Sequence, residues 1–136
     1  MKSLKIVFAF VAMFVAASFG NAQVKTEWKE KTEFHKVMSQ TFHPAEEGNY
    51  APIRSRINEL VEKAEAFKNS QIPAEFANQK AIKNNLKKLA KQTKAFRKKI
   101  NKGATDEQLK DDFMALHDTF HQVVGLCTAE DKHDEH

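Results

Sequence analysis

Four stretches of the sequence repeat apolar residues with the 3.6-residue period of an α-helix, and this pattern constrains the fold most strongly. They span about 26–42, 52–69, 74–102 and 105–128, and the third begins at either Ala74 or Asn78. Glycine and proline fall mainly between the stretches, where they interrupt helices. Four amphipathic helices with short loops pack best as an antiparallel, up-down-up-down bundle. We therefore predict an all-α four-helix bundle.

Each predicted helix has an apolar stripe that we expect to face the core. In chain order the stripes are Phe34, Val37, Met38, Thr41, Phe42 and Ala45; Ile53, Ile57, Leu60, Val61, Ala64 and Phe67; Ile82, Leu86, Leu89, Ala90, Thr93, Phe96 and Ile100; and Leu109, Phe113, Leu116, Phe120, Val123, Val124 and Cys127. Two apolar loop residues, Tyr50 and Ile72, are expected to plug the ends of the bundle.

Local signals predict where the helices begin and end. Pro44 disfavours the helical conformation at His43, so the first helix is expected to end there. Gly103 is a good C-terminal stop for the third helix. Thr105, with Gln108 three residues later, has the pattern of a capping box at the start of the fourth helix.

The first 22 residues have the pattern of a secretory signal peptide. A short basic leader precedes an uncharged apolar run at 6–19, and small residues precede an expected cut before Gln23. The bundle then occupies 23–128, and 129–136 form a charged tail that we expect to be disordered. We predict a periplasmic or secreted protein without stable membrane insertion after signal cleavage, because the apolar run is too short to span a bilayer.

Composition argues against several classes of function. Cys127 is the only cysteine, so the chain can form no internal disulfide and lacks the Cys-x-x-Cys-His motif that attaches c-type haem. One Trp, one Tyr and no basic–aromatic module argue against nucleic-acid binding. The sequence also has no recognisable nucleophile–base pair or phosphate-binding glycine loop, so we do not predict an enzyme. The oligomeric state stays open.

The third helix has a lysine-rich face opposite its apolar stripe. Its members are Lys83, Lys87, Lys88, Lys91, Lys94, Lys98, Lys99 and Lys102. Contact with an anionic surface is one interpretation. We favour a solvated face whose lysine stems cover apolar surface, because amides are interspersed among the lysines.

Histidines form the strongest candidate site. His117 and His121 are four residues apart in the fourth helix, so both project from one side. His35 lies on the flank of the first helix that should face them if the two helices are antiparallel neighbours. With residue 28 placed opposite 127, His35 falls opposite residue 120. Three imidazoles at one height could bind a transition metal, copper or zinc above others.

Two further residues leave alternatives open. His43 is eight residues from His35, about 12 Å along a straight helix, so it joins the same site only if the helix unwinds or the register shifts. Otherwise it caps the last carbonyls of its helix. Met38 could be an axial ligand if the bundle binds haem, although methionine in an apolar stripe is more often core.

The arrangement resembles the cytochrome c′ and cytochrome b562 family of periplasmic four-helix bundles. The likeness rests on a signal peptide, four helices, a proline-bearing loop after the first and a histidine in the last. His121 matches the haem-ligating histidine of cytochrome c′, but His117 and Phe120 stand where the attachment cysteines would be. The resemblance implies non-covalent haem b, with Met38 or His35 as axial partner, as an alternative to a metal ion. A third alternative is a structural or interaction bundle with no cofactor.

Overall fold

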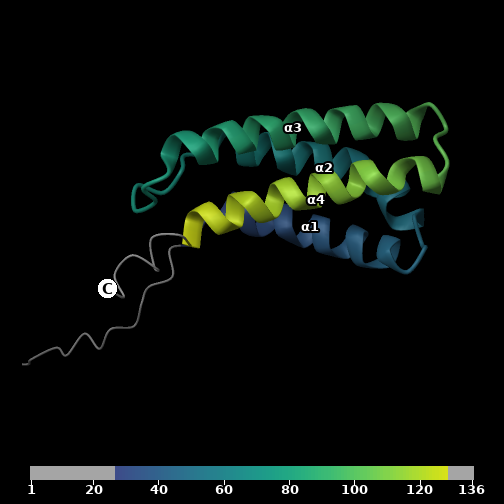
Figure 1. Ribbon diagram of the computed structural model, residues 1–136, viewed down its shortest axis with the longest axis horizontal. Coiled ribbons are helices and arrows are strands. Elements are labelled where there is room, and N and C mark those ends of the chain that lie inside the picture. Colours follow the sequence, from purple (N-terminus) through teal and green to yellow (C-terminus); the bar gives the residue numbers. More distant parts are fainter. Residues whose placement is uncertain (1–26, 129–136) are drawn as a thin grey trace, which may run out of the picture.

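The protein is an all-helical four-helix bundle in a computed structural model that describes residues 27–128 (Figure 1). The predicted signal peptide and charged tail lie outside that range. The helices are α1 (Lys29–Glu46), α2 (Ala51–Asn69), α3 (Gln79–Asn101) and α4 (Asp106–Thr128). Neighbouring helices pack α1 on α2, α2 on α3 and α3 on α4, and α4 returns beside α1. Three connections join these four helices in chain order.

Polar contacts at the helix ends show how the bundle is closed. The indole N–H of Trp28, before α1, donates to Ser70 Oγ after α2 at 2.9 Å. The amide of Asn78, before α3, donates to the carbonyl of Leu126 near the end of α4 at 3.5 Å. These contacts place the start of one helix beside the end of the next, as an alternating course of the chain requires.

The core is built from the predicted stripes. Every stripe residue is buried except Ile100 and Val124, which are half-buried. Tyr50 and Ile72 pack against the core, as predicted. Two buried residues were not predicted, Trp28 and Thr119. Thr119 can be buried because its hydroxyl donates to the carbonyl of Ala115 at 3.0 Å, so no polar group is left unpaired.

The prediction that α1 ends at His43 was wrong, because α1 continues through Pro44 to Glu46. A Schellman motif ends it instead: Asn49 N–H donates to the carbonyl of Pro44 at 2.9 Å, and Gly48 N–H donates to that of Ala45 at 3.0 Å. Gly48 supplies the left-handed conformation, with φ of 88°. Burial of Ala45 in the core favours this extra turn, which places His43 inside the helix.

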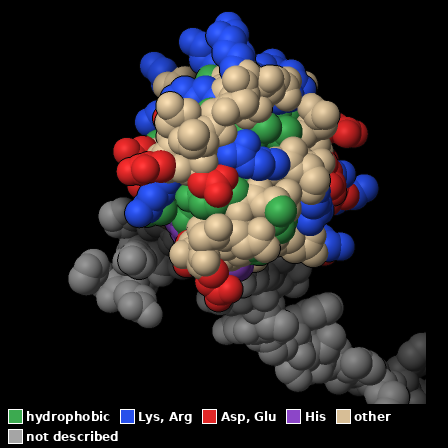
Figure 2. Space-filling view, turned by 90° about the vertical axis from the view of Figure 1, so that its right-hand side faces the viewer, with side chains coloured by type: hydrophobic (Ala, Val, Ile, Leu, Met, Phe, Trp, Pro, Cys, Tyr) green, Lys and Arg blue, Asp and Glu red, His purple; other side chains and the backbone are tan. Residues whose placement is uncertain are grey.

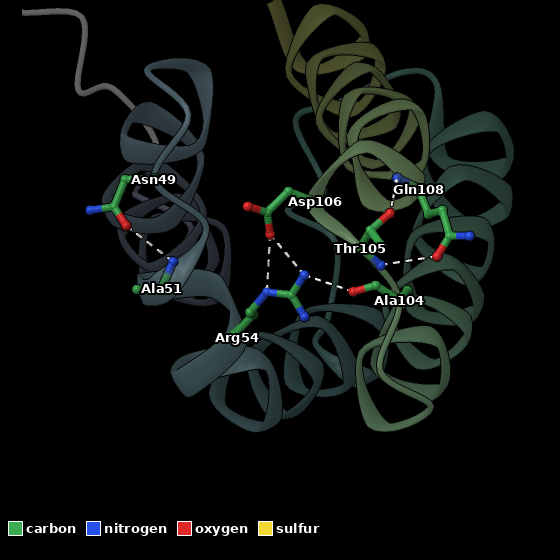
Figure 3. A network of polar contacts seen from close by, with 7 residues as sticks. All are labelled: Asn49, Ala51, Arg54, Ala104, Thr105, Asp106 and Gln108. Carbon is green, nitrogen blue, oxygen red and sulfur yellow. Dashed lines mark hydrogen bonds and ion pairs between the residues drawn. The ribbon is translucent and has the colours of Figure 1, made fainter.

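The predicted signals between α3 and α4 are confirmed. Gly103 has φ of 80°, and Ala104 N–H donates to the carbonyl of Lys99 at 3.1 Å, which ends α3. Thr105 N–H donates to Gln108 Oε1 at 2.9 Å and Gln108 N–H to Thr105 Oγ1 at 3.3 Å, which completes the capping box (Figure 3).

Arg54, in the first turn of α2, links α2 to the α3–α4 turn and to the start of α4. Its guanidinium donates to Asp106 Oδ1 at 2.8 Å and to the carbonyl of Ala104 at 2.7 Å (Figure 3). The starts of α2 and α4 therefore lie at the same end of the bundle. This contact stabilises the α3–α4 turn from outside.

Candidate functional site

The α1–α4 seam is the line along which His35 and Phe42 of α1 meet His117 and Phe120 of α4, and His121 lies beside it against His117. The imidazole of His35 stacks on Phe120, with ring centroids 5.5 Å apart and planes 15° from parallel. Phe42 meets Phe113 edge to face at 5.1 Å. Both pairs match the register predicted from the sequence, in which residue 35 lies opposite residue 120.

His117 and His121 turn their rings toward each other at this seam. Their Nε2 atoms are 3.1 Å apart, and their ring centroids are 4.3 Å apart at an interplanar angle of 75°. The pair follows directly from its four-residue spacing on one helix. One imidazole can donate an Nε2–H to the bare Nε2 of the other, so the contact holds one proton between two nitrogens.

Phe42 holds one member of the pair in place from the opposite helix. Its ring lies flat against the imidazole of His117, with centroids 3.8 Å apart and planes 6° from parallel. Phe42 is itself buried between α1 and α4, against Phe113. A core side chain therefore fixes the orientation of His117, while His121 is exposed.

The surroundings of His117 favour its neutral form. Burial lowers the pKa of its imidazole, and the nearby His121 lowers it further. Asp118 and Glu46 act in the opposite direction, and His43 adds a smaller lowering effect. The net pKa lies below the ordinary histidine value of 6.5. His117 therefore carries a free nitrogen lone pair over more of the physiological pH range than an isolated histidine.

The other predicted site residues lie at different places in the bundle. His35 is exposed and contacts the ring of Phe120. His43 is exposed in the last turn of α1 and close enough to His117 to influence its charge. Met38 is 1% exposed within the core cluster. Cys127 is also buried, which raises the pKa of its thiol.

The structure brings two of the predicted histidines into contact. Within residues 27–128, no group of three or more His, Cys, Asp or Glu side chains is arranged to hold a metal ion. The pair is therefore the centre of the candidate site, and any third protein ligand must reach it by a change of side-chain rotamer.

Two residues of the site were not predicted from the sequence. Phe42 was assigned only to the core, although the same register that pairs it with Phe113 also brings it one turn from His117. Glu46 was expected to lie beyond the end of α1, because Pro44 was expected to stop that helix at His43. The glycine at position 48 is the sequence signal for the longer helix.

No protein-family model matches this sequence, and comparison with characterised proteins and with solved structures finds no similar chain. The resemblance to the bundle cytochromes therefore stays a prediction. Among the described helices, none is long and apolar enough to cross a membrane.

Proposed function

We propose that this protein binds a transition-metal ion through the Nε2 atoms of His117 and His121. The observation that supports the proposal most is their separation of 3.1 Å. Two nitrogens that each lie about 2.0–2.1 Å from one tetrahedral ion are roughly 3.3 Å apart. The pair therefore needs only an outward rotation of the rings to hold an ion beside the line that joins the two nitrogens, in place of the shared proton.

The protonation of the pair is compatible with this exchange. Metal ligation needs a bare Nε2 on both imidazoles, so binding would release the proton that the pair shares. The lowered pKa of His117 reduces the competition from a second proton. Stacking on Phe42 already restricts the ring of His117, so this side chain loses less conformational entropy when a metal ion binds.

His43 is our candidate for a third ligand. It lies on α1 next to Phe42, and its charge and that of Glu46 act on His117. His35 is the other candidate, but its ring lies against Phe120. Water or Glu46 could occupy the remaining positions. Nitrogen donors of this kind suit zinc or copper, and the general affinity order favours copper.

Haem b is the less favoured cofactor. Met38, the proposed axial ligand, is 1% exposed and surrounded by the packed core cluster. The ring of His35 is exposed on the seam, where it stacks on Phe120. Either side chain would have to ligate the haem together with His121, and Met38 could do so only if the core opened. The predicted export of the chain suits either cofactor.

Calorimetric titration of the protein with Cu²⁺ and Zn²⁺ tests the proposal. We expect one tightly bound ion in the wild type and loss of that site in His117→Gln with His121→Gln. The variant His133→Gln with His136→Gln removes the same number of histidines from the C-terminal segment and is the matched control. Unchanged binding in the seam variant would overturn the proposal, and a Soret band in the purified protein would favour haem.

A further inference from the structure

All the charged side chains of helix α3 are positive. Between Gln79 and Asn101 it has eight lysines and one arginine and no acidic residue. All eight lysines are exposed, and six of them follow one another at intervals of three or four residues, so these six share one face. This lysine stripe consists of Lys80, Lys83, Lys87, Lys91, Lys94 and Lys98.

The lysine stripe is almost entirely without neutralising partners in the part of the chain that the structure describes. Lys94 forms an ion pair with Glu65 of α2, with 2.6 Å between Nζ and Oε1. No other member of the stripe pairs with a carboxylate of residues 27–128. Like charges one helical turn apart destabilise a helix by roughly 0.2–0.5 kcal/mol per pair. A face that is merely solvated commonly avoids this cost by alternating the signs of its charges.

A groove beside the lysine stripe contains one further lysine side chain, from α2. It lies between α2 and α3, has a volume of about 480 Å³ and is lined by Lys68 of α2 together with Lys83, Lys87, Lys91 and Lys94 of the stripe. Glu65 also lines it but is held by Lys68 and Lys94 at 3.0 and 2.6 Å. The groove therefore has a net positive charge and room for a phosphate-bearing group.

The stripe projects from one edge of the molecule. Figure 2 views the bundle from its end, and Lys and Arg side chains extend from the top of the molecule, where α3 lies, with no acidic side chain among them in this view. The stripe spans 19 residues, from Lys80 to Lys98, or about 27 Å of helix. A plane of negative charge can therefore contact all six ammonium groups at once.

We propose that the lysine stripe docks the protein on an anionic lipid bilayer through phosphate headgroups. Charge alone would hold it there, because Met114 on α4 is the only large apolar side chain that is exposed within residues 27–128. Each lysine near such a surface contributes about 1 kcal/mol, so six give useful affinity without insertion. The absence of exposed aromatic rings on the stripe favours this partner over single-stranded nucleic acid, which needs stacking platforms.

Sedimentation with vesicles tests this proposal independently of any metal. We expect the protein to bind phosphatidylcholine vesicles that contain phosphatidylglycerol, to ignore pure phosphatidylcholine and to be released by high salt. The variant Lys83→Gln, Lys87→Gln and Lys91→Gln should bind the anionic vesicles roughly a hundredfold more weakly, at about fivefold per lysine. Circular dichroism verifies that this variant keeps its helices.

A control variant separates the stripe from net charge. Lys29→Gln, Lys36→Gln and Lys110→Gln removes the same charge from exposed positions on α1 and α4. We expect it to retain most of the vesicle affinity. Equal weakening by both variants, or no binding of the wild type to anionic vesicles, would overturn the proposal. Binding to a soluble polyanion such as heparin without binding to vesicles would overturn it as well.

Discussion

The α1–α4 seam differs from the other three contacts between neighbouring helices in what crosses it. Ion pairs join α1 to α2 (Glu33–Lys63, 3.4 Å), α2 to α3 (Glu65–Lys94, 2.6 Å) and α3 to α4 (Lys99–Asp112). Within the described chain, no ion pair crosses from α1 to α4. That seam is crossed by ring contacts instead, such as those of Phe42 with His117 and His35 with Phe120.

This difference explains why the candidate site lies where it does. The rings of Phe34, Phe42, Phe113 and Phe120 fill the space between α1 and α4, and these two helices approach each other closely at the fewest points. The imidazoles of His35 and His117 therefore rest on aromatic faces rather than against carboxylates, which would favour the protonated form of an imidazole. One seam offers neutral nitrogen donors, and the α2–α3 seam offers lysine charge.

The largest expected effect tests whether aromatic packing stabilises the α1–α4 seam. Phe120→Ala removes a ring that is 3% exposed and contacts Phe34 and His35. We expect a loss of about 3–5 kcal/mol in the free energy of unfolding. Denaturant titration followed by the fluorescence of Trp28, the single tryptophan, measures it. A loss below about 1 kcal/mol would mean that the seam is not part of the core.

The second prediction concerns metal-linked stability. At a free Zn²⁺ concentration a hundred times its dissociation constant, the wild type should gain about 2.7 kcal/mol in the free energy of unfolding. The double variant His117→Gln with His121→Gln should gain nothing. Glu65→Gln, in the α2–α3 seam, should gain as much as the wild type. A reduced gain in Glu65→Gln would show that the two seams are coupled.

The third prediction identifies the ligand from α1. His43→Gln should weaken metal binding about tenfold or more, because His43 is near His117 and even losing an outer partner of a metal ligand costs about 10–100-fold. His35→Gln is the matched control on the same helix and should leave the affinity unchanged. Calorimetric titration compares the two variants with the wild type. The opposite result would restore the triad of His35, His117 and His121 that the sequence suggested.

The sequence predicted the fold well because each level of the pattern agreed. The apolar stripes, the capping box of Thr105 and Gln108 and the stop at Gly103 all favoured the same four helices. The error at Pro44 arose where local preference and packing disagreed. Pro44 cannot donate to the carbonyl of Gln40 as another residue in a helix would, but the burial of Ala45 and the Schellman motif that follows outweigh this loss.

The candidate site was predictable only in part. Spacing along α4 was enough to pair His117 with His121, since one helix fixes that geometry. The neighbours from α1 depend on side-chain direction across two helices. Side chains of α4 lean toward its start, which carries the ring of His117 past the level of Met38 to Phe42. Wheel angles and axial levels alone do not include this displacement.

The smallest expected effect tests the ion pair of the α2–α3 seam. Hydrogen bonds from Lys94 and Lys68 lower the pKa of the Glu65 carboxyl below its ordinary value of 4.5. The folded protein therefore binds the Glu65 proton less readily than the unfolded chain, so the pair stabilises folding above pH 4.5. Because Glu65 is partly exposed, Glu65→Gln should cost only about 0.5–1 kcal/mol at neutral pH.

That cost should fall as the pH drops below 4.5 and disappear below the folded-state pKa, since Glu65 is then protonated in both states. Urea unfolding of the wild type and of Glu65→Gln over a pH series measures the difference. A difference that persists at low pH would mean that Glu65 acts through packing. In that case the ion pair between Lys99 and Asp112 would be the better example of a purely electrostatic contact between helices, to set against the aromatic contacts of the α1–α4 seam.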